Sequence, residues 1–299
     1  MKQQTITRKP TQLHVLPGLQ ENILKALATY KYLTISQFLM LDLGIRNRIY
    51  EAIKTLHGYG FVKYAEFVSY IRHNGKVQRI HYLTPKGAKF LVDHTPNLHY
   101  DDIRYPKSTT LFTHDYYHRV SSINTQIAVI KWLKECSFEL VRYANYFDVT
   151  GSRRKHHINP SHAITRIEFG NDFFVDPDGI LIYENHEKKP KIILIETYNG
   201  SDTKRTVGQL RKHSYAVKHG LAAKKYDIHA PTRVCSTFET KEAMQAVIER
   251  LKDDEYFQFK NIELYFYFAV ADDVITDFDT AFVDLSGTRR RMKDLSVIT

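Results

Sequence analysis

Two acidic residues of the sequence are spaced so that they can meet at one divalent cation. Asp178 belongs to the turn-like sequence DPDG of residues 176–179, and Glu196 ends the hydrophobic run 191–196, 17 residues after Gly179. A turn that carries one carboxylate, beside a strand that ends in another, can place both around Mg²⁺ or Mn²⁺. Such a metal ion can activate a water and stabilise the charge that develops on a cleaved phosphodiester. The sequence therefore predicts Asp178 and Glu196 as ligands of Mg²⁺ or Mn²⁺.

The order Pro-Asp, a gap, and an acid that closes a hydrophobic strand resembles the PD-(D/E)xK nuclease superfamily. The superfamily has a lysine two positions after the second acid, and here that position is Tyr198. The site must therefore recruit a lysine from elsewhere or lose activity. Downstream candidates are Lys204, Gln209 and, on the next helix, Lys212. The alternative is that Asp178 is only a turn residue and Glu196 a carboxylate at the surface end of a strand.

Four further side chains are candidates to line the same cleft. His114 and His118 are four residues apart on an expected helix and favour a cleft position, and the alternative is that both are simply exposed. A zinc site is weaker still, because no third ligand is in view. Tyr215 lies on the polar face of the helix that carries Lys212. Tyr198 most simply packs beside the sheet, and the alternative is a nucleophile that forms a phosphotyrosine link.

The first third of the chain has the element order of a winged helix-turn-helix. Apolar spacing predicts three helices, then two strand-like runs joined by the turn signal His73-Asn74-Gly75, then a last helix from about Pro85. The three helices are expected at residues 19–28, 36–41 and 46–56, and the strands at 61–71 and 76–83. The third helix would enter the major groove of DNA and the hairpin tip would contact phosphates.

Charge supports a nucleic-acid partner for this part of the chain. The formal net charge is +10, and residues 1–110 hold 16 Lys and Arg against 7 Asp and Glu, whereas residues 111–299 hold 27 against 26. The alternative for the winged helix is dimerisation or another protein contact. The predicted DNA-binding residues are Arg46, Asn47, Arg48, Tyr50 and Lys54 on the third helix, Arg72, Lys76 and Arg79 on the hairpin, and Arg153, Arg154 and Lys155 in a basic loop.

Long helical segments, such as the one expected at residues 204–224, alternate with β-branched runs after residue 112, which predicts an α/β domain with a mixed central sheet. Within this domain the runs 173–175 and 179–183 look like strands around a turn. We expect a flexible arm at residues 1–17, the winged helix at 18–95, a linker at 96–112, the α/β domain at 113–272 and a tail at 273–299.

The whole order resembles the plasmid replication-relaxation family and the related MobC-type conjugative relaxases. The elements that carry the resemblance are the winged helix, a helix opening with His114, Pro177-Asp178-Gly179, Ile195-Glu196, and a helix with Lys212 and Tyr215. The resemblance implies a restriction-endonuclease-like second domain and metal-dependent nicking or relaxation of plasmid DNA at an origin. It also implies Asp178 and Glu196 as metal ligands, with Lys212 assisting, and double-stranded origin DNA and other mobilisation or replication proteins as partners.

Several classes are excluded or replaced by alternatives. Only Cys136 and Cys235 occur, no run of 18 apolar residues is present, and the N-terminus lacks an apolar signal segment, so we expect a cytoplasmic protein without a membrane partner. No GxxxxGK[ST] loop or dinucleotide glycine motif occurs, which disfavours an NTPase or a dehydrogenase. The alternatives to a nickase are a catalytically silent DNA-binding replication or mobilisation factor and a winged-helix transcription regulator with a ligand-sensing α/β domain.

Overall fold

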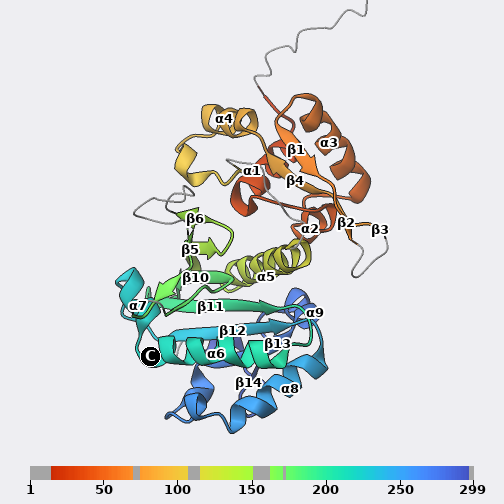
Figure 1. The fold of residues 1–299 in the computed structure, drawn as a ribbon. Coiled ribbons are helices and arrows are strands. Elements are labelled where there is room, and N and C mark those ends of the chain that lie inside the picture. The colour runs from red at the N-terminus through yellow and green to blue at the C-terminus, as the bar shows by residue number, and fades with distance from the viewer. Residues whose placement is uncertain (1–14, 70–74, 107–114, 151–161, 171–172, 296–299) are drawn as a thin grey trace, which may run out of the picture. The chain divides into compact units, whose positions relative to one another are not determined.

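The computed structural model describes residues 15–69, 75–106, 115–150, 162–170 and 173–295. The chain divides into two compact units, Met1–Tyr116 and Tyr117–Thr299. Within the described residues the fold is mixed α/β, with ten α-helices and a six-stranded sheet (Figure 1). None of the described helices combines the length and the apolar character that a bilayer span requires.

The first unit contains three helices, two short antiparallel strand pairs and a fourth helix. The pair β1–β4 and the pair β2–β3 are both antiparallel. The elements are α1 (Gly18–Tyr30), α2 (Ile35–Met40), α3 (Arg46–Gly58), β1 (Val62–Ala65), β2 (Val68–Ser69), β3 (Gly75–Lys76), β4 (Ile80–Leu83), α4 (Pro85–His94) and the 3₁₀ turn η1 (Tyr100–Asp102).

Local sequence explains where two of these helices begin. Thr34 and Gln37 form a capping box at α2: the Gln37 backbone N–H donates to the Thr34 hydroxyl (3.3 Å), and the Thr34 N–H donates to the Gln37 side-chain oxygen (2.9 Å). These bonds satisfy amides that a helix N-terminus leaves open. At α4 the Thr84 side chain caps Gly87 N–H, with Pro85 in the first turn, where a missing N–H costs nothing.

The second unit is built on one mixed sheet with the strand order β14-β13-β12-β11-β10-β5. The pairs β11–β12 and β12–β13 are parallel, and the other pairs are antiparallel. The predicted mixed α/β class is therefore confirmed. The strands are β5 (Glu139–Asn145), β10 (Gly179–Glu184), β11 (Pro190–Tyr198), β12 (Thr232–Phe238), β13 (Phe266–Val270) and β14 (Val283–Asp284).

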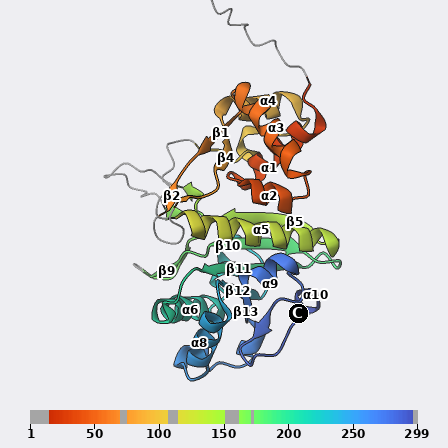
Figure 2. The same ribbon diagram turned by 90° about the vertical axis from the view of Figure 1, so that its right-hand side faces the viewer.

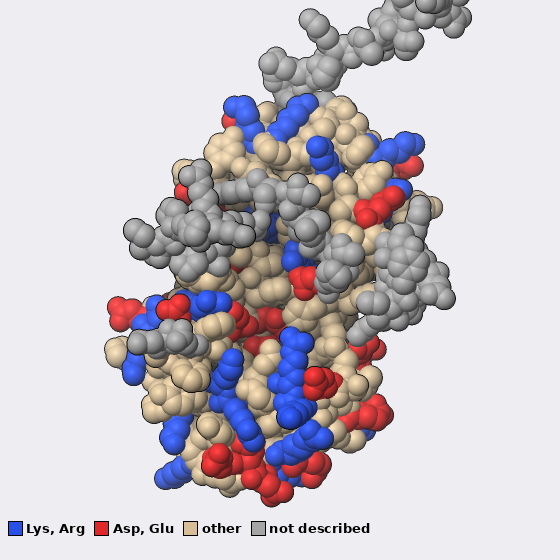
Figure 3. Space-filling view, viewed as in Figure 1, with Lys and Arg blue, Asp and Glu red and all other residues tan. Residues whose placement is uncertain are grey.

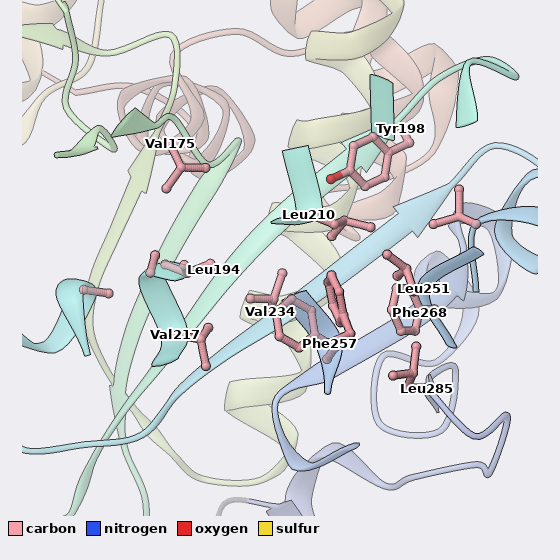
Figure 4. Packing of buried hydrophobic residues seen from close by; sticks show 14 of the residues in the cluster. Val175, Leu194, Tyr198, Leu210, Val217, Val234, Leu251, Phe257, Phe268 and Leu285 are labelled. Atoms are coloured by element: carbon pink, nitrogen blue, oxygen red, sulfur yellow. The ribbon is translucent and has the colours of Figure 1, made fainter. Parts of the chain in front are cut away.

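Helices cover both faces of this sheet. Figure 2 shows α5 (Tyr116–Glu135) over one face, and α6 (Thr203–Lys218) and α8 (Lys241–Lys252) over the other. On the α5 face, Trp132 packs edge-on against Tyr183 at 5.5 Å between ring centroids. On the other face, Leu194, Leu210, Val234 and Phe268 belong to one buried apolar cluster (Figure 4). The sheet and α6 thus share a buried apolar core, which fixes the position of α6 relative to the end of β11.

Two sequence expectations about pairing and helix length were wrong. The run 173–175 was expected to pair with 179–183 around a turn, but β9 (Phe174–Val175) pairs with β8 (Ile167–Glu168), while β10 pairs with β5 and β11. The expected helix 204–224 is two helices, because Gly220 adopts φ +60° between α6 and α7 (Leu221–Tyr226).

The structure also places elements in segments for which the sequence predicted none. Part of α9 (Ala271–Thr276), β14 and α10 (Met292–Leu295) lie in the expected tail, and η1 lies in the expected linker. Apolar side chains account for this in the tail, since Phe278, Phe282 and Met292 are buried. The remaining described elements are β6 (Val149–Thr150), β7 (His162–Ala163) and the 3₁₀ turns η2 (Glu255–Phe257) and η3 (Ile262–Leu264).

Candidate active site

Strands β10 and β11 bring Asp178 and Glu196 opposite each other. Their antiparallel register pairs Gly179 with Ile195, so the residue before Gly179 and the residue after Ile195 form the next opposed pair. Opposed residues project to the same face, with Cβ atoms roughly 5 Å apart. That face is the one beneath α6, because Leu194, two residues before Glu196, lies in the apolar cluster shared with α6. The structure thus brings together the two acids that the sequence singled out.

Both carboxylate oxygens of Asp178 have partners. Oδ1 lies 2.7 Å from Nε2 of His118 on α5, and Oδ2 accepts a hydrogen bond of 2.7 Å from the backbone N–H of Thr197. Asp178 is 7% exposed, and the His118 side chain is 30% exposed. These contacts fix the direction of the Asp178 carboxylate. The Asp178 carboxylate is therefore fixed in position just before β10, which goes beyond the role of a turn residue.

Glu196 forms a second carboxylate–imidazole pair, and this pair is buried. Oε1 lies 2.5 Å from Nε2 of His213 on α6, and His213 is fully buried. Burial, together with the charge of Asp178, raises the pKa of Glu196 well above its ordinary value. Burial lowers the pKa of His213 to about 3, so its imidazole is neutral at pH 7.

Tyr198, two residues after Glu196, is part of the core. Its hydroxyl is buried and has no hydrogen-bond partner among the described residues. Its ring packs against Phe238 at 5.1 Å, and Figure 4 shows it beside Leu210. Burial, with the nearby Glu196 and Asp178 charges, raises the pKa of the Tyr198 phenol. A phenol that is buried and harder to ionise is a poor nucleophile, so the packing interpretation fits this geometry better.

A polar cavity of about 240 Å³ opens at the two carboxylates. Its walls come from the first turn of α5, from the segment before β10, from the end of β11 and from the first two turns of α6. The lining residues are His118, Asp176, Asp178, Glu196, Thr197, Tyr198, Asn199, Gly200, Asp202, Arg205, Thr206 and Gln209. Asp176 in this wall is held by a two-point ion pair with Arg166, at 3.0 and 2.9 Å. Arg205 and Gln209 also line the cavity, and they add a cation and a neutral hydrogen-bond donor to it.

The other predicted cleft residues lie outside this lining. Lys212 is exposed on α6, with its ammonium nitrogen 5.6 Å from the Phe174 ring centroid. Tyr215 packs on Phe169 at 5.0 Å, and Lys204 is exposed in the first turn of α6. Lys212 points away from Glu196 because the adjacent residue, His213, occupies the inward face of the helix. His114 lies outside the described residues.

The predicted DNA-binding residues of the first unit are mostly on the surface of α3. Arg46, Asn47, Arg48, Tyr50 and Lys54 are all exposed, while Ile49, Ile53 and Leu56 are buried on the opposite side of the helix. Arg79 is exposed, pairs with Glu66 at 2.5 Å and lies over the Tyr64 ring. Lys76 is placed by its backbone in β3. Arg72, Arg153, Arg154 and Lys155 lie outside the described residues.

The donor chemistry of the site suits a divalent cation. Two carboxylates and one imidazole are ligands that Mn²⁺ accepts, and carboxylates alone suit Mg²⁺. The mutual charge that raises the pKa of Glu196 is one that a bound cation would relieve. Across the described residues, however, no group of three or more His, Cys, Asp or Glu side chains is arranged to hold a metal ion. Each acid is instead bonded to one histidine.

His213 is the site residue that sequence analysis missed. It takes an inward position on α6, three residues after Leu210 and four before Val217, both of which are buried. A histidine in the apolar stripe of a helix that follows an acid-ending strand was the available signal. The Thr197 amide carried no signal, because a backbone group is invisible in a sequence pattern.

Comparison with protein-family models, with curated proteins and with solved structures finds no match to this chain. The functional argument therefore depends on the geometry described above.

Proposed function

We propose that this chain is a DNA-processing protein of a plasmid or another mobile element. Its first unit is a winged helix-turn-helix that binds double-stranded origin DNA, and its second unit is a restriction-endonuclease-like domain that nicks or relaxes that DNA with Mg²⁺ or Mn²⁺. Other mobilisation or replication proteins are its expected partners. The observation that carries the proposal is the opposed pair Asp178 and Glu196 in a polar cavity, with the pKa of Glu196 raised.

In the second unit each residue has a role that its contacts support. Asp178 and Glu196 would hold the metal ion, which supplies a Lewis acid and an activated water at the phosphodiester. The Thr197 N–H and His118 orient Asp178, and His213 orients Glu196. Arg205 lines the cavity with a guanidinium that suits a phosphate oxygen.

In the first unit the element order and the exposed cations support DNA binding. Helix α3 follows α2 after a short turn and presents Arg46, Asn47 and Arg48 at its N-terminal end. In helix-turn-helix proteins that end of the recognition helix contacts base edges, and arginine and asparagine pair with guanine and adenine. The hairpin β2–β3 takes the place of the wing.

The test is nicking of a supercoiled plasmid that carries the DNA flanking the coding sequence of this chain. We expect conversion to the open-circular form in Mn²⁺ and none in EDTA. Asp178→Asn and Glu196→Gln should each reduce the rate by at least about 100-fold, since each removes a charged ligand. Lys241→Ala, an exposed change on α8, is the matched control and should nick normally.

The observation at Tyr198 favours a second candidate, a catalytically silent DNA-binding replication or mobilisation factor. A buried tyrosine cannot supply the cation that a lysine at this position would supply. Wild-type protein that binds the plasmid but leaves it supercoiled in Mg²⁺, Mn²⁺ and EDTA alike would overturn the nicking proposal in favour of this one. A ligand-sensing transcription regulator finds less support, because the cavity at the acids is lined mainly by polar side chains.

A further inference from the structure

A stripe of exposed residues runs along α6 away from the carboxylate cavity. Arg205 lines the cavity, and Gly208, Lys212, Tyr215 and His219 follow at alternating steps of three and four residues. This spacing keeps all five on one face of the helix. Four of the residues belong to α6, and His219 is the residue at its C-terminal end. We call these five residues the α6 track; Figure 3 shows Lys and Arg side chains gathered over the position of α6.

Aromatic rings from the β8–β9 hairpin lie beside the α6 track. Phe169 packs on Tyr215 at 5.0 Å, and Tyr215 packs on His219 at 4.3 Å. The Arg166 guanidinium lies 3.7 Å from the centroid of the Phe174 ring, and the Lys212 ammonium lies 5.6 Å from the same centroid. Cations and aromatic rings are therefore in contact on one surface that begins at the cavity.

Two aromatic side chains of this surface are exposed to solvent. Tyr215 is 41% exposed, and Phe173 is 66% exposed. The Phe169 N–H donates to the Phe173 carbonyl at 2.8 Å, so Phe173 lies across the hairpin from Phe169, the residue that packs on Tyr215. A ring of this size costs free energy when it stays in water, so a protein that keeps two of them exposed beside cations has surface available for a flat, negatively charged partner.

Gly208, between Arg205 and Lys212 of the track, provides an independent observation. It lies in the second turn of α6 without a positive φ, and a Cβ built there would meet nothing within 4 Å. Neither backbone conformation nor packing within the protein requires glycine there, although alanine would favour the helix more. A helix that lacks a side chain at one exposed position lets another backbone approach closely.

We propose that the α6 track and Phe173 bind an unpaired nucleic-acid strand and lead it to the carboxylate cavity. Unpaired bases can stack on Tyr215 and Phe173, whereas the bases of a duplex are already stacked. Arg205 and Lys212 lie two helical turns apart, about 10.5 Å along the axis, so they can meet two phosphates of one strand, and Gly208 leaves room for the sugar-phosphate backbone between them. The direction of the strand toward the acids depends on the proposed function; the binding surface does not.

The test measures binding of a fluorescein-labelled 12-nucleotide oligothymidylate to the full chain in EDTA. All variants carry Arg46→Ala and Arg48→Ala, which remove two exposed arginines of α3. Tyr215→Ala and Phe173→Ala should each weaken binding about 10-fold, the usual loss for one stacked base. Tyr215→Phe keeps the ring and should bind within about 2-fold of the parent. Lys241→Ala on α8 is the control for charge and should have no effect.

Gly208→Glu separates binding from folding. The change meets open space and improves helix propensity, so the melting temperature should not fall, yet oligothymidylate binding should drop at least about 10-fold. Gly208→Ala should raise the melting temperature by roughly 2 °C. Parent-like binding by both Gly208→Glu and Tyr215→Ala would overturn the inference. Competition by polyglutamate stronger than by unlabelled oligothymidylate would overturn it in favour of an acidic protein partner.

The two proposals fail differently in these assays. A protein that binds oligothymidylate through the track but never nicks plasmid retains this inference and loses the nuclease proposal. A Gly208→Glu protein that nicks supercoiled plasmid at the wild-type rate and binds oligothymidylate normally retains the nuclease and loses the track.

Discussion

At the scale of single residues, the buried hydroxyl of Tyr198 separates two interpretations of the site. The hydroxyl has no hydrogen-bond partner among the described residues, and an unpaired buried polar group costs about 1–3 kcal/mol. We therefore expect Tyr198→Phe to raise the free energy of unfolding by about 1 kcal/mol and to leave plasmid nicking unchanged. Chemical denaturation and the plasmid assay measure the two quantities. A loss of nicking without a loss of stability would restore Tyr198 as a nucleophile.

His81 predicts acid sensitivity in the first unit. It lies in β4, packs against Phe38 and Tyr64, and has no hydrogen-bond partner for either ring nitrogen among the described residues. Burial, with the nearby Arg79 and His57 charges, lowers its pKa from 6.5 to about 4. The unfolded chain therefore binds a proton between these values that the folded chain does not, and stability falls as pH falls from about 6.5 to 4.

His81→Phe should abolish that part of the acid sensitivity, because phenylalanine keeps the ring and cannot be protonated. The difference in unfolding free energy between the variant and the wild type should grow by about 3 kcal/mol from pH 7 to pH 4. Urea unfolding at both pH values checks this. Equal pH profiles for the two proteins would show that His81 is protonated within the fold without cost.

The sequence predicted only those residues of the candidate site whose type and spacing indicate metal binding. Asp178 and Glu196 were found because carboxylates at the ends of a turn and a hydrophobic strand are visible as a pattern, and the β10–β11 register then placed them together. His213 was missed because its role depends on which turn of α6 lies over Glu196. Lys212, one residue earlier, was selected for its charge, although a helix turns neighbouring side chains about 100° apart.

At the scale of elements, the short helix α2 depends on its first turn. The Thr34–Gln37 capping box satisfies two backbone positions of a helix of only six residues, Ile35–Met40. We expect Thr34→Ala to lower the free energy of unfolding by about 1 kcal/mol and to increase amide exchange in α2. Because α2 packs beside α3, affinity for duplex DNA should fall as well; hydrogen-exchange mass spectrometry and DNA titration measure the two effects. Unchanged exchange in α2 would contradict the cap argument.

Element positions followed from apolar periodicity, but element pairing did not. The spacing of Leu24, Leu27, Ile49 and Ile53 marks helices whose inner faces are buried. The DPDG sequence suggested a hairpin turn, but its two carboxylates are bound elsewhere, Asp176 to Arg166 and Asp178 to His118 and Thr197. Those partners lie 10, 60 and 19 residues away in the sequence, outside the turn itself. The local preference of the DPDG sequence for a hairpin turn was therefore overridden by contacts that form only in the folded sheet.

At the scale of the whole molecule, charge is divided unevenly along the chain. Residues 1–110 hold nearly all of the net positive charge of +10, and α3 exposes Arg46, Arg48 and Lys54. Binding to duplex DNA should therefore weaken steeply with salt, because each neutralised phosphate releases counterions. Lys54→Ala, which removes an exposed cation of α3 away from the N-terminal end proposed to contact bases, should reduce the log–log salt slope by about 1. Fluorescence titrations at salt concentrations from about 50 to 200 mM measure this slope. An unchanged slope would place α3 away from DNA.

The pairing of β14 with β13 has a consequence for synthesis on the ribosome. The sheet receives this outermost strand from residues 283–284, and the buried Asp284 accepts hydrogen bonds from Ser286, Thr288 and Arg290. Until these residues have emerged from the ribosome, β13 is an exposed edge strand of the sheet. An apolar edge strand can pair with a strand of another chain. Chaperone binding to the nascent chain should therefore fall once residues 283–290 have emerged and β14 has paired with β13.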